Sequence, residues 1–544
     1  MRRLARLLIA AAFACAAIPT IASAQAAPSP APFRPLPNVH DAVTHGTAVA
    51  GGRRIAYTAR AGTILLKDKE NDPAASMFYV AYTADRTDAR TRPVTFFWNG
   101  GPGSSTIWLH MGSFGPVRVD VPNNATQPGA APTLRNNDAT LLDTSDLVFV
   151  DAIGTGWSTV VARGKTSDYY GVDEDAKAFS QFIQRWITRN GRWQSPKFLF
   201  GESYGTTRAA NVANLLQTDG VAVSGIVLLS SALDYNFLPF GNGPGEDLAY
   251  IGYLPTEAAV AWYHHKAAGN PPSLPAFLNE VRAFAGGPYA QALLRGDTLD
   301  STTRAQIVAK MHAYTGLSPA YIEAANLRIN PNRFEQELLR AEGRNVGRYD
   351  GRYSGPAIDR NAAFVDYDPS DTMTSAAYVA AFNHYAHDVL HYRDDRPYDV
   401  LDFKVNQDWK YQRGTDPSAV SVVADLQSVM VQNPSLHVLS ANGYFDLATS
   451  FYGTEYLLNH LNLSLEQRKR LHYAYFNSGH QVYLNHDALV QFKNELVTFY
   501  RTATTAPTRV SRTATTVPGR VARAAVAGTR GVRGAPDARE RTQR

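Results

Sequence analysis

Short runs of apolar residues alternate with helical patterns through the first half of the chain and return near its end. The runs at 93–98, 146–150, 197–200 and 225–229 are apolar at nearly every position, which is typical of parallel strands buried on both faces. Helical patterns over 172–187 and 208–216 predict helices between them. Two later runs, at 436–440 and 471–476, predict the last strands of the same sheet. The pattern predicts an α/β fold with an open, mostly parallel central sheet flanked by helices.

The region from 236 to 424 has a different pattern of apolar and polar residues. Its helical segments are broken by proline, glycine and asparagine, and it has no apolar run comparable with those of the sheet. The 544 residues also exceed the size of one ordinary domain. We therefore predict a large, mainly helical cap inserted at 236–424 into a core formed by 25–235 and 425–501.

Residues 1–24 have the features of a secretory signal peptide. Arginines at positions 2, 3 and 6 give a basic start, an apolar stretch follows over 7–18, and Ala22-Ser-Ala24 fits a cleavage site. The apolar stretch is short for a membrane anchor, and the residues before Cys15 make a poor lipidation site. We expect cleavage after Ala24, a mature chain without cysteine or an integral membrane segment, and export to the periplasm or the medium.

The net charge of +5 is concentrated at the two ends of the chain. The segment 502–544 contains nine arginines, two acidic residues and no aromatic residue, so we predict a disordered basic tail. The stretch between the signal peptide and this tail is mildly acidic, and we expect no nucleic-acid partner. The tail is either dispensable or a tether to an acidic envelope surface.

The apolar run at 197–200 leads into Gly201-Glu-Ser203-Tyr-Gly205, and a helical pattern follows at once. A strand, a sharp turn at a serine between glycines, and a helix define a nucleophile elbow, which lifts the serine hydroxyl off the sheet. Serine between glycines is common in ordinary turns, so the strand and helix on either side carry the argument. They predict Ser203 as the nucleophile of an acyl-transfer reaction.

Asp446 and His480 follow the last two predicted strands. A serine nucleophile needs an imidazole to accept its proton and a carboxylate to orient that imidazole. Taken alone, Asp446 also fits a helix cap, and His480 is one of 14 histidines. Their order after Ser203 is that of α/β-hydrolases, and each lies at the end of a late strand. We therefore predict the triad Ser203, Asp446 and His480.

A glycine-rich loop, Asn99-Gly-Gly-Pro-Gly-Ser-Ser105, follows the run at 93–98. Such a loop between a strand and a helix can be merely a tight turn. With an elbow downstream, it is expected to present backbone N–H groups to a tetrahedral oxyanion.

Four motifs together resemble the serine carboxypeptidase family of α/β-hydrolases. They are the Asn-Gly-Gly-Pro-Gly loop at 99–103, the segment Asp151-Ala-Ile-Gly-Thr-Gly-Trp-Ser158, the elbow at 201–205 and the Gly-His pair at 479–480. The resemblance spans residues 50–500, and the cap is matched only by position. It implies an α/β-hydrolase fold and peptide substrates with a free C-terminus.

The resemblance also implies roles for single residues. Ser203 is the nucleophile, His480 the general base and then the general acid, and Asp446 the residue that orients His480. The backbone N–H groups of Gly101 and Tyr204 are the implied oxyanion donors.

Asn99 and Glu202 are implied to bind the C-terminal carboxylate of the substrate. An amide and a protonated carboxylic acid can both donate a hydrogen bond to a carboxylate, whereas an ionised glutamate would repel it. Glu202 is therefore expected to be protonated when substrate binds, and acidic working conditions follow.

Three positions depart from the family pattern. Ser113 stands where the family usually has a second acidic residue before a Gly-Pro, and Phe97 stands where it usually has tryptophan. Ser104 replaces the usual cysteine, in keeping with a cysteine-free mature chain. Ser113 puts exopeptidase specificity and the degree of acid preference in question but leaves the triad unchanged.

Nothing in the sequence calls for a cofactor. It has no P-loop, no zinc-finger spacing and no complete dinucleotide motif. His384, His387 and His391 share one face of a possible helix, but a polar face of a cap helix is the commoner explanation, so we expect no metal.

Three functions fit these features. The first is an exported serine carboxypeptidase, and the second is a related hydrolase or acyltransferase that acts on esters or on non-C-terminal amides, as Ser113 suggests. The third, a catalytically silent binding protein, is disfavoured by the presence of a triad, an elbow and an oxyanion loop together.

Overall fold

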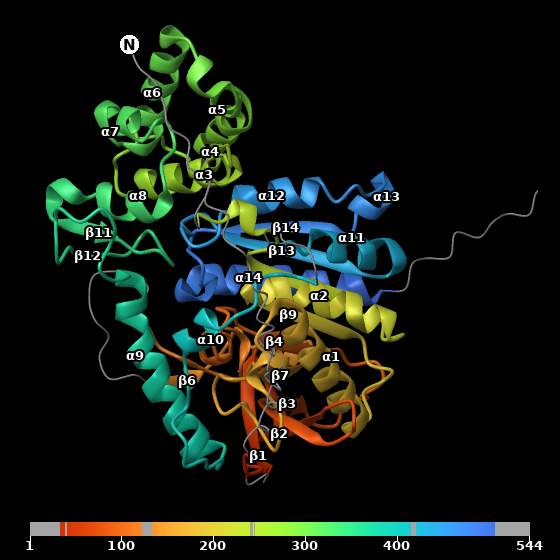
Figure 1. The fold of residues 1–544 in the computed structure, drawn as a ribbon. Helices are drawn as coiled ribbons and strands as arrows, with labels where there is room; N and C mark the ends of the chain where they lie inside the picture. The colour runs from red at the N-terminus through yellow and green to blue at the C-terminus, as the bar shows by residue number, and fades with distance from the viewer. Residues whose placement is uncertain are drawn as a thin grey trace, which may run out of the picture. The chain divides into compact units, whose positions relative to one another are not determined.

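The central sheet has the strand order β1-β2-β3-β7-β4-β9-β10-β13-β14, and β8 pairs with β3 (Figure 1). In this computed structural model β1, β2, β3 and β7 are antiparallel neighbours, and the strands from β7 to β14 run parallel. The predicted fold class, a mostly parallel sheet flanked by helices, is confirmed. The strands of this sheet are β1 Ala42–Ala50, β2 Arg53–Lys67, β3 Pro73–Ala84, β4 Val94–Trp98, β7 Asp146–Val150, β8 Thr159–Val160, β9 Lys197–Ser203, β10 Gly225–Ser231, β13 His437–Gly443 and β14 Leu471–Phe476.

The structure describes residues 33–37, 41–121, 133–239, 243, 245–414 and 420–505. The predicted signal peptide with Cys15, and nearly all of the predicted basic tail, lie outside these residues. The last helix ends at Thr504, so the folded body continues slightly beyond the predicted end of the core at 501.

The parallel strands form where the apolar runs predict them. Strands β4 and β7 are buried at every position, as expected for strands covered on both faces. Strands β1 to β3 are not among the strands predicted from such runs. In β1 buried or half-buried positions alternate with exposed ones, so its sequence lacks the continuous apolar character of a central strand.

The helices of the core begin where sequence chemistry favours them. Helix α1 has three acidic residues in its first turn and an arginine in its last, which matches the helix dipole. The helices are α1 Val172–Arg189, α2 Tyr204–Thr218, α3 Leu248–Tyr263, α4 Leu274–Phe284, α5 Ala290–Arg295, α6 Ser301–Thr315, α7 Pro319–Ala324, α8 Pro331–Glu337, α9 Pro369–His384, α10 Phe403–Gln407, α11 Val423–Gln432, α12 Phe451–Asn459, α13 Leu465–Arg468 and α14 His486–Thr504. None of the helices in the described ranges has both the length and the apolar character needed to span a bilayer.

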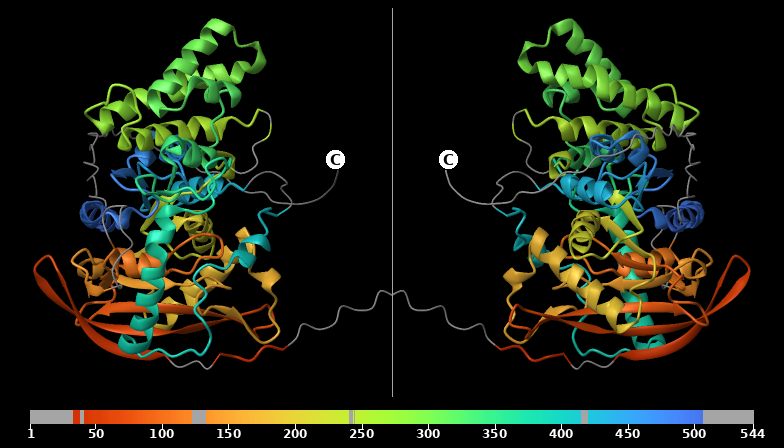
Figure 2. Two further views of the ribbon diagram at one scale, coloured as in Figure 1. Left: turned by 90° about the vertical axis from the view of Figure 1, so that its left-hand side faces the viewer. Right: turned by 90° about the vertical axis from the view of Figure 1, so that its right-hand side faces the viewer.

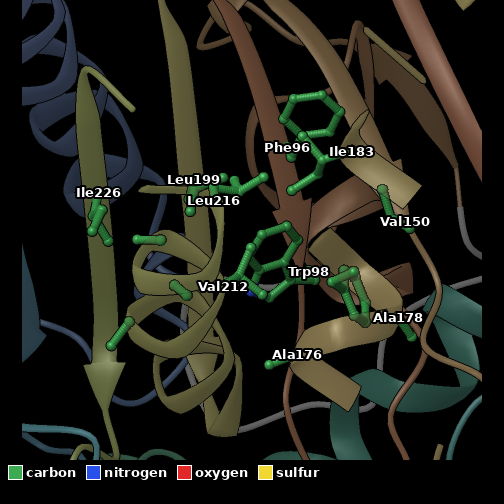
Figure 3. Packing of buried hydrophobic residues seen from close by; sticks show 14 of the residues in the cluster. Phe96, Trp98, Val150, Ala176, Ala178, Ile183, Leu199, Val212, Leu216 and Ile226 are labelled. Carbon is green, nitrogen blue, oxygen red and sulfur yellow. The ribbon is translucent and has the colours of Figure 1, made fainter. Parts of the chain in front are cut away.

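Two hydrophobic layers enclose the sheet. On one face α1, α2 and α11 pack against side chains such as Trp98, Leu199 and Ile226, part of which is seen in Figure 3. On the other face α9, α14 and a short helix over Leu109–Phe114 pack against side chains that include Phe97 and Phe200. Consecutive residues of β4, Phe97 and Trp98, therefore point into opposite layers, as the pleat of a strand requires.

Between β10 and β13 the chain forms mainly helices, α3 to α11, together with a small hairpin of β11 Arg344–Val346 and β12 Ser354–Pro356. A second short pair, β5 Val117–Val119 with β6 Leu134–Asn136, lies between β4 and β7 in the chain. Helices α3 to α8 share a hydrophobic cluster of their own. Figure 2 shows them gathered on the side of β13 and β14, away from β1 to β3.

Candidate active site

Ser203 is the last residue of β9, and Tyr204 is the first residue of α2. The backbone of Ser203 has φ 61° and ψ −131°, an unusual conformation for a residue with a side chain. The flanking glycines permit this turn because backbones approach closely there. A Cβ atom on Gly205 would lie 2.8 Å from the Trp98 carbonyl oxygen, and one on Gly201 would overlap the Gly205 carbonyl. This segment has the geometry of a nucleophile elbow.

His480 and Asp446 form a buried pair at the ends of β14 and β13. The Nδ1 atom of His480 lies 2.8 Å from Oδ2 of Asp446, and the two side chains are 3% and 1% exposed. Asp446 is fixed in turn by the backbone N–H groups of Ala448 and Thr449, at 2.8 and 2.9 Å, and by the Thr449 hydroxyl. Because Nδ1 faces the carboxylate, Nε2 is the nitrogen left to accept a proton.

Ser203 and His480 are connected through the end of β10. Ser203 pairs with Ser231, and the hydroxyl of the neighbouring Ser230 donates a hydrogen bond of 2.7 Å to the His480 carbonyl oxygen. Among the described residues no hydrogen bond joins the Ser203 hydroxyl to the His480 ring. Catalytic hydrogen bonds are often long until substrate binds. The structure thus brings Asp446 and His480 into direct contact and places Ser203 at the same edge of the sheet.

The predicted oxyanion donors lie beside the elbow. Strand β4 pairs Trp98 with Gly201 of β9, so the loop with Gly101 and the elbow leave the sheet together. A Cβ atom on Gly100 would lie 2.5 Å from the Tyr204 nitrogen. Within the described ranges the Gly101 N–H donates no hydrogen bond, and Tyr204, as the first residue of α2, has no intrahelical acceptor. Both donors are thus free to bind an oxyanion.

The oxyanion loop is held from two sides. The Trp98 indole N–H donates to the Gly205 carbonyl oxygen at 2.8 Å, which ties the end of β4 to the start of α2. From the other side, the Ser105 N–H donates to the Val400 carbonyl oxygen at 3.0 Å. Trp98 therefore contacts the elbow directly through this hydrogen bond, although the family resemblance places the tryptophan one position earlier.

Asn99 and Glu202, the predicted carboxylate-binding pair, contact each other. The Asn99 amide donates to Oε1 of Glu202 at 2.8 Å, and its own oxygen accepts from the Leu109 N–H at 3.0 Å. The second carboxyl oxygen of Glu202, Oε2, is buried and has no hydrogen-bond partner among the described residues. Burial raises the pKa of Glu202 from 4.5 to about 7, so the carboxyl group is protonated in acidic solution.

Tyr483 is a third polar residue at this site, and the sequence does not indicate it. It lies in a short helical turn just after His480. Its hydroxyl is buried without a hydrogen-bond partner in the described part of the chain, yet lies close enough to Glu202 to lower the pKa of that group. Nothing in the sequence distinguishes Tyr483 from the other 27 tyrosines of a chain that contains 28.

Two opposing effects act on the pKa of His480. Burial disfavours the charged imidazolium and lowers the pKa, but the Asp446 carboxylate and its hydrogen bond favour the charged form. The net result is a pKa above the ordinary value of 6.5. His480 therefore binds a proton more readily than a free imidazole.

Ser113 does not replace the missing second acid. It is fully buried in the short helix over Leu109–Phe114, and its hydroxyl donates to the Leu109 carbonyl oxygen at 2.5 Å. Because that proton is used within its own helix, Ser113 is not a donor for a substrate.

Arg208 and Asp175 form a buried ion pair beneath the elbow that sequence reasoning missed. The Arg208 side chain is 0% exposed, and its Nε donates to Asp175 at 2.7 Å. Its Nη1 donates to the Asn99 carbonyl oxygen, also at 2.7 Å. Arg208 lies on α2 about one turn after Ser203. This spacing was the only sequence signal that Arg208 lies close to the elbow. The pair links α1, α2 and the oxyanion loop.

Replacing Arg208 with methionine is expected to destabilise the protein by about 3–5 kcal/mol, because Asp175 loses its partner in a buried position. Urea unfolding followed by circular dichroism measures this change. The matched control is Arg90→Met, which breaks an exposed pair with Asp88 and should leave the free energy of unfolding nearly unchanged. Equal losses in the two variants would contradict the assigned role of Arg208.

The histidines at 384, 387 and 391 do not share one regular helix. Helix α9 ends at His384, and both His384 and His387 bond to Asp388 at 2.7 and 2.8 Å. In the part of the chain that the structure describes, no group of three or more His, Cys, Asp or Glu side chains is arranged to hold a metal ion.

The fold and the site define the class of the protein as an α/β-hydrolase with a nucleophile elbow. Residues 58–224 match the model of the serine carboxypeptidase family. The resemblance inferred from the motifs is confirmed.

Several curated relatives match part of the sequence. Serine carboxypeptidase-like 44 of Arabidopsis thaliana is 30% identical over 177 residues, which cover 31% of this chain and 33% of the relative. Serine carboxypeptidase-like 41 of the same plant is 30% identical over 161 residues, or 28% and 30% of the two chains. The match thus spans about a third of the curated relatives' length.

A solved structure extends the similarity of the fold. The crystal structure of Kex1Δp, a prohormone-processing carboxypeptidase from Saccharomyces cerevisiae, superposes with a TM-score of 0.52 at 16% identity. The superposition covers 82% of this chain and 91% of that chain. At this identity the match supports the shared α/β-hydrolase fold.

Proposed function

We propose that this protein is a serine-type carboxypeptidase, which hydrolyses the last peptide bond of peptides through an acyl-enzyme intermediate. The observation that carries the proposal is the position of Glu202. This buried carboxyl group directly precedes Ser203 and has a pKa of about 7, and its Oε2 atom has no partner within hydrogen-bond distance among the described residues. A protonated carboxyl beside a serine nucleophile fits a substrate that ends in a carboxylate.

In the proposed acylation step, His480 Nε2 accepts the Ser203 proton as the serine oxygen attacks the carbonyl carbon of the last peptide bond. Asp446 holds the imidazole in the required tautomer and stabilises its charged form. The Gly101 and Tyr204 N–H groups stabilise the oxyanion of the tetrahedral intermediate. His480 then gives its proton to the departing amine, and the C-terminal amino acid leaves.

Deacylation repeats these steps with water as the nucleophile. His480 accepts a proton from the water molecule, the second tetrahedral intermediate collapses, and Ser203 regains its proton. The products are the shortened peptide and one free amino acid.

Recognition of the free C-terminus is assigned to Asn99 and Glu202, as the family resemblance implies. Tyr483 lies beside Glu202, and its hydroxyl supplies a further donor. In this proposal these groups bind the C-terminal carboxylate of the substrate, which an acid pair does elsewhere in the family.

The second candidate, a hydrolase of esters or non-C-terminal amides, is favoured by one observation. Ser113 stands in the position of the second acid and uses its hydroxyl internally. A matched pair of peptides, one ending in a free acid and one in an amide, separates the two functions. A carboxypeptidase releases the last residue from the acid much faster, whereas the second function predicts no preference for the acid.

The pH dependence for the two peptides should differ. For the peptide acid, activity should fall at low pH because His480 becomes protonated, and it should fall again as pH rises through about 7 because Glu202 ionises and repels the carboxylate. For the peptide amide only the first loss remains, so its optimum should lie at higher pH. Glu202→Gln keeps a donor and cannot ionise, so it should remove the high-pH loss for the acid. Profiles of kcat/KM against pH that superimpose for acid and amide would contradict carboxylate recognition by Glu202.

A further inference from the structure

The turn over 348–352 lies far from the triad in sequence, between β11 and β12, and yet contacts both loops that bear Asp446 and His480. On the Asp446 side, the Leu447 N–H donates to the Arg348 carbonyl oxygen at 3.1 Å. The Gly351 N–H donates to the carbonyl oxygen of Phe445 at 2.9 Å. Backbone bonds thus hold the residues immediately before and after Asp446.

The same turn holds the loop with His480. The His480 N–H donates to the Tyr349 carbonyl oxygen at 2.6 Å, and the Gly479 N–H donates to Oδ2 of Asp350 at 3.1 Å. A Cβ atom on Gly479 would lie 2.5 Å from the Cα atom of Asp350, so the close approach requires glycine there. The Tyr349 ring also packs on the His480 ring, with centroids 5.3 Å apart.

Asp350 is the centre of this arrangement. Its carboxylate is 0% exposed and accepts two hydrogen bonds from the Arg352 guanidinium through Nε and Nη2, at 2.9 and 2.5 Å. The same Nη2 donates to the Ser478 hydroxyl at 3.2 Å. One buried ion pair therefore forms hydrogen bonds with Ser478 and Gly479, the two residues directly before His480.

The turn is itself anchored to α9. The Asp350 N–H donates to the Ser370 hydroxyl at 3.2 Å, and the Tyr349 N–H donates to Asp368 at 3.0 Å. Asp368 and Ser370 lie at the start of α9, which packs against the sheet through the second hydrophobic layer. The contact of the turn with the triad loops is thus fixed by a rigid element.

We propose that the turn over 348–352 is a positioning element of the active site, with Asp350 as its principal positioning residue. It sets the separation of the Asp446 and His480 loops and so keeps the bond between these two side chains. Small displacements of catalytic groups have large effects on rate, about a hundredfold for 1 Å. The inference rests on the proposed function, but its geometric part concerns the Asp446–His480 bond alone.

The test compares Asp350→Asn with Asp247→Asn. Asp247, the residue directly before α3, forms a similar two-point pair with Arg328, at 2.7 and 3.0 Å. Each variant is assayed for kcat, for KM and for the rate of reaction with a fluorophosphonate. A low-field proton NMR spectrum reports the His480 Nδ1–H in the bond to Asp446 without any substrate.

We expect Asp350→Asn to lower kcat and the labelling rate by about tenfold to a hundredfold. KM should change little, and the His480 resonance should shift or broaden. Asp247→Asn should leave kcat within twofold and the resonance unchanged. If Asp350→Asn does not fold, the double variant Asp350→Leu/Arg352→Met removes the buried charges together, which is far less destabilising than removing one, and it should show the same losses.

An Asp350→Asn protein with wild-type kcat and an unchanged His480 resonance would overturn the inference. So would equal losses in the two single variants. If the unmodified enzyme fails to react with the fluorophosphonate, the proposed function fails, and the resonance still decides whether Asp350 positions His480.

Discussion

Replacing Ser203 with alanine should lower kcat/KM by about 10⁴-fold to 10⁶-fold, the usual cost of removing the nucleophile of a triad. In the proposed mechanism the Ser203 oxygen forms the acyl-enzyme, so its removal should abolish covalent catalysis. The fold should survive, because Ser203 makes no side-chain hydrogen bond to its helix and is only partly buried. Hydrolysis of a peptide acid and far-UV circular dichroism measure the two effects.

Ser231→Ala is the matched control for this prediction. Ser231 lies opposite Ser203 in the next strand, and its buried hydroxyl has no hydrogen-bond partner among the described residues. Its replacement should leave kcat/KM within a few-fold of the unmodified enzyme. Substantial activity in Ser203→Ala, together with loss of activity in Ser231→Ala, would show that Ser203 is not the nucleophile and that the nucleophile lies on the neighbouring strand.

His480→Ala should be as severe as Ser203→Ala, and Asp446→Asn should lower kcat by about 10⁴-fold. An asparagine at 446 would present an N–H group to Nδ1 of His480, so the ring proton would move to Nε2. Nε2 could then no longer accept the serine proton. The loss should be smaller than for His480→Ala, because the imidazole still occasionally adopts the productive form.

His437→Ala provides the comparison for the histidine variant. His437 is half-buried at the opposite end of β13, where its ring stacks on His472. It should retain nearly full activity. A His480→Ala enzyme with more than a tenth of the unmodified activity would contradict the general-base role.

The strands that carry the site were predictable because each is a short apolar run, and β9 and β13 are buried at nearly every position. The predicted triad residues Ser203, Asp446 and His480 lie at the end of β9 and just after β13 and β14, in that order. Strand β1 was missed because it alternates half-buried with exposed positions, whereas β3 is buried at nearly every position and its apolar run was overlooked. The signal peptide and the basic tail stay predictions, since they lie outside the described residues.

The supporting residues were harder to find because their partners are distant in sequence. Arg208 meets Asp175 on another helix, and Asp350 meets Gly479 across more than a hundred residues. Tyr483 contributes through burial beside Glu202, a property that no local pattern encodes. Only the motifs in which sequence neighbours act together, the elbow and the oxyanion loop, could be recognised directly.

Mass spectrometry of the unmodified enzyme after fluorophosphonate treatment tests the central claim most directly. Digestion followed by peptide mapping locates the phosphonyl group on a single residue. We predict one adduct per chain, on Ser203, with none in Ser203→Ala. An adduct on a different serine, or no adduct in folded protein, would contradict the assignment of Ser203 as the nucleophile.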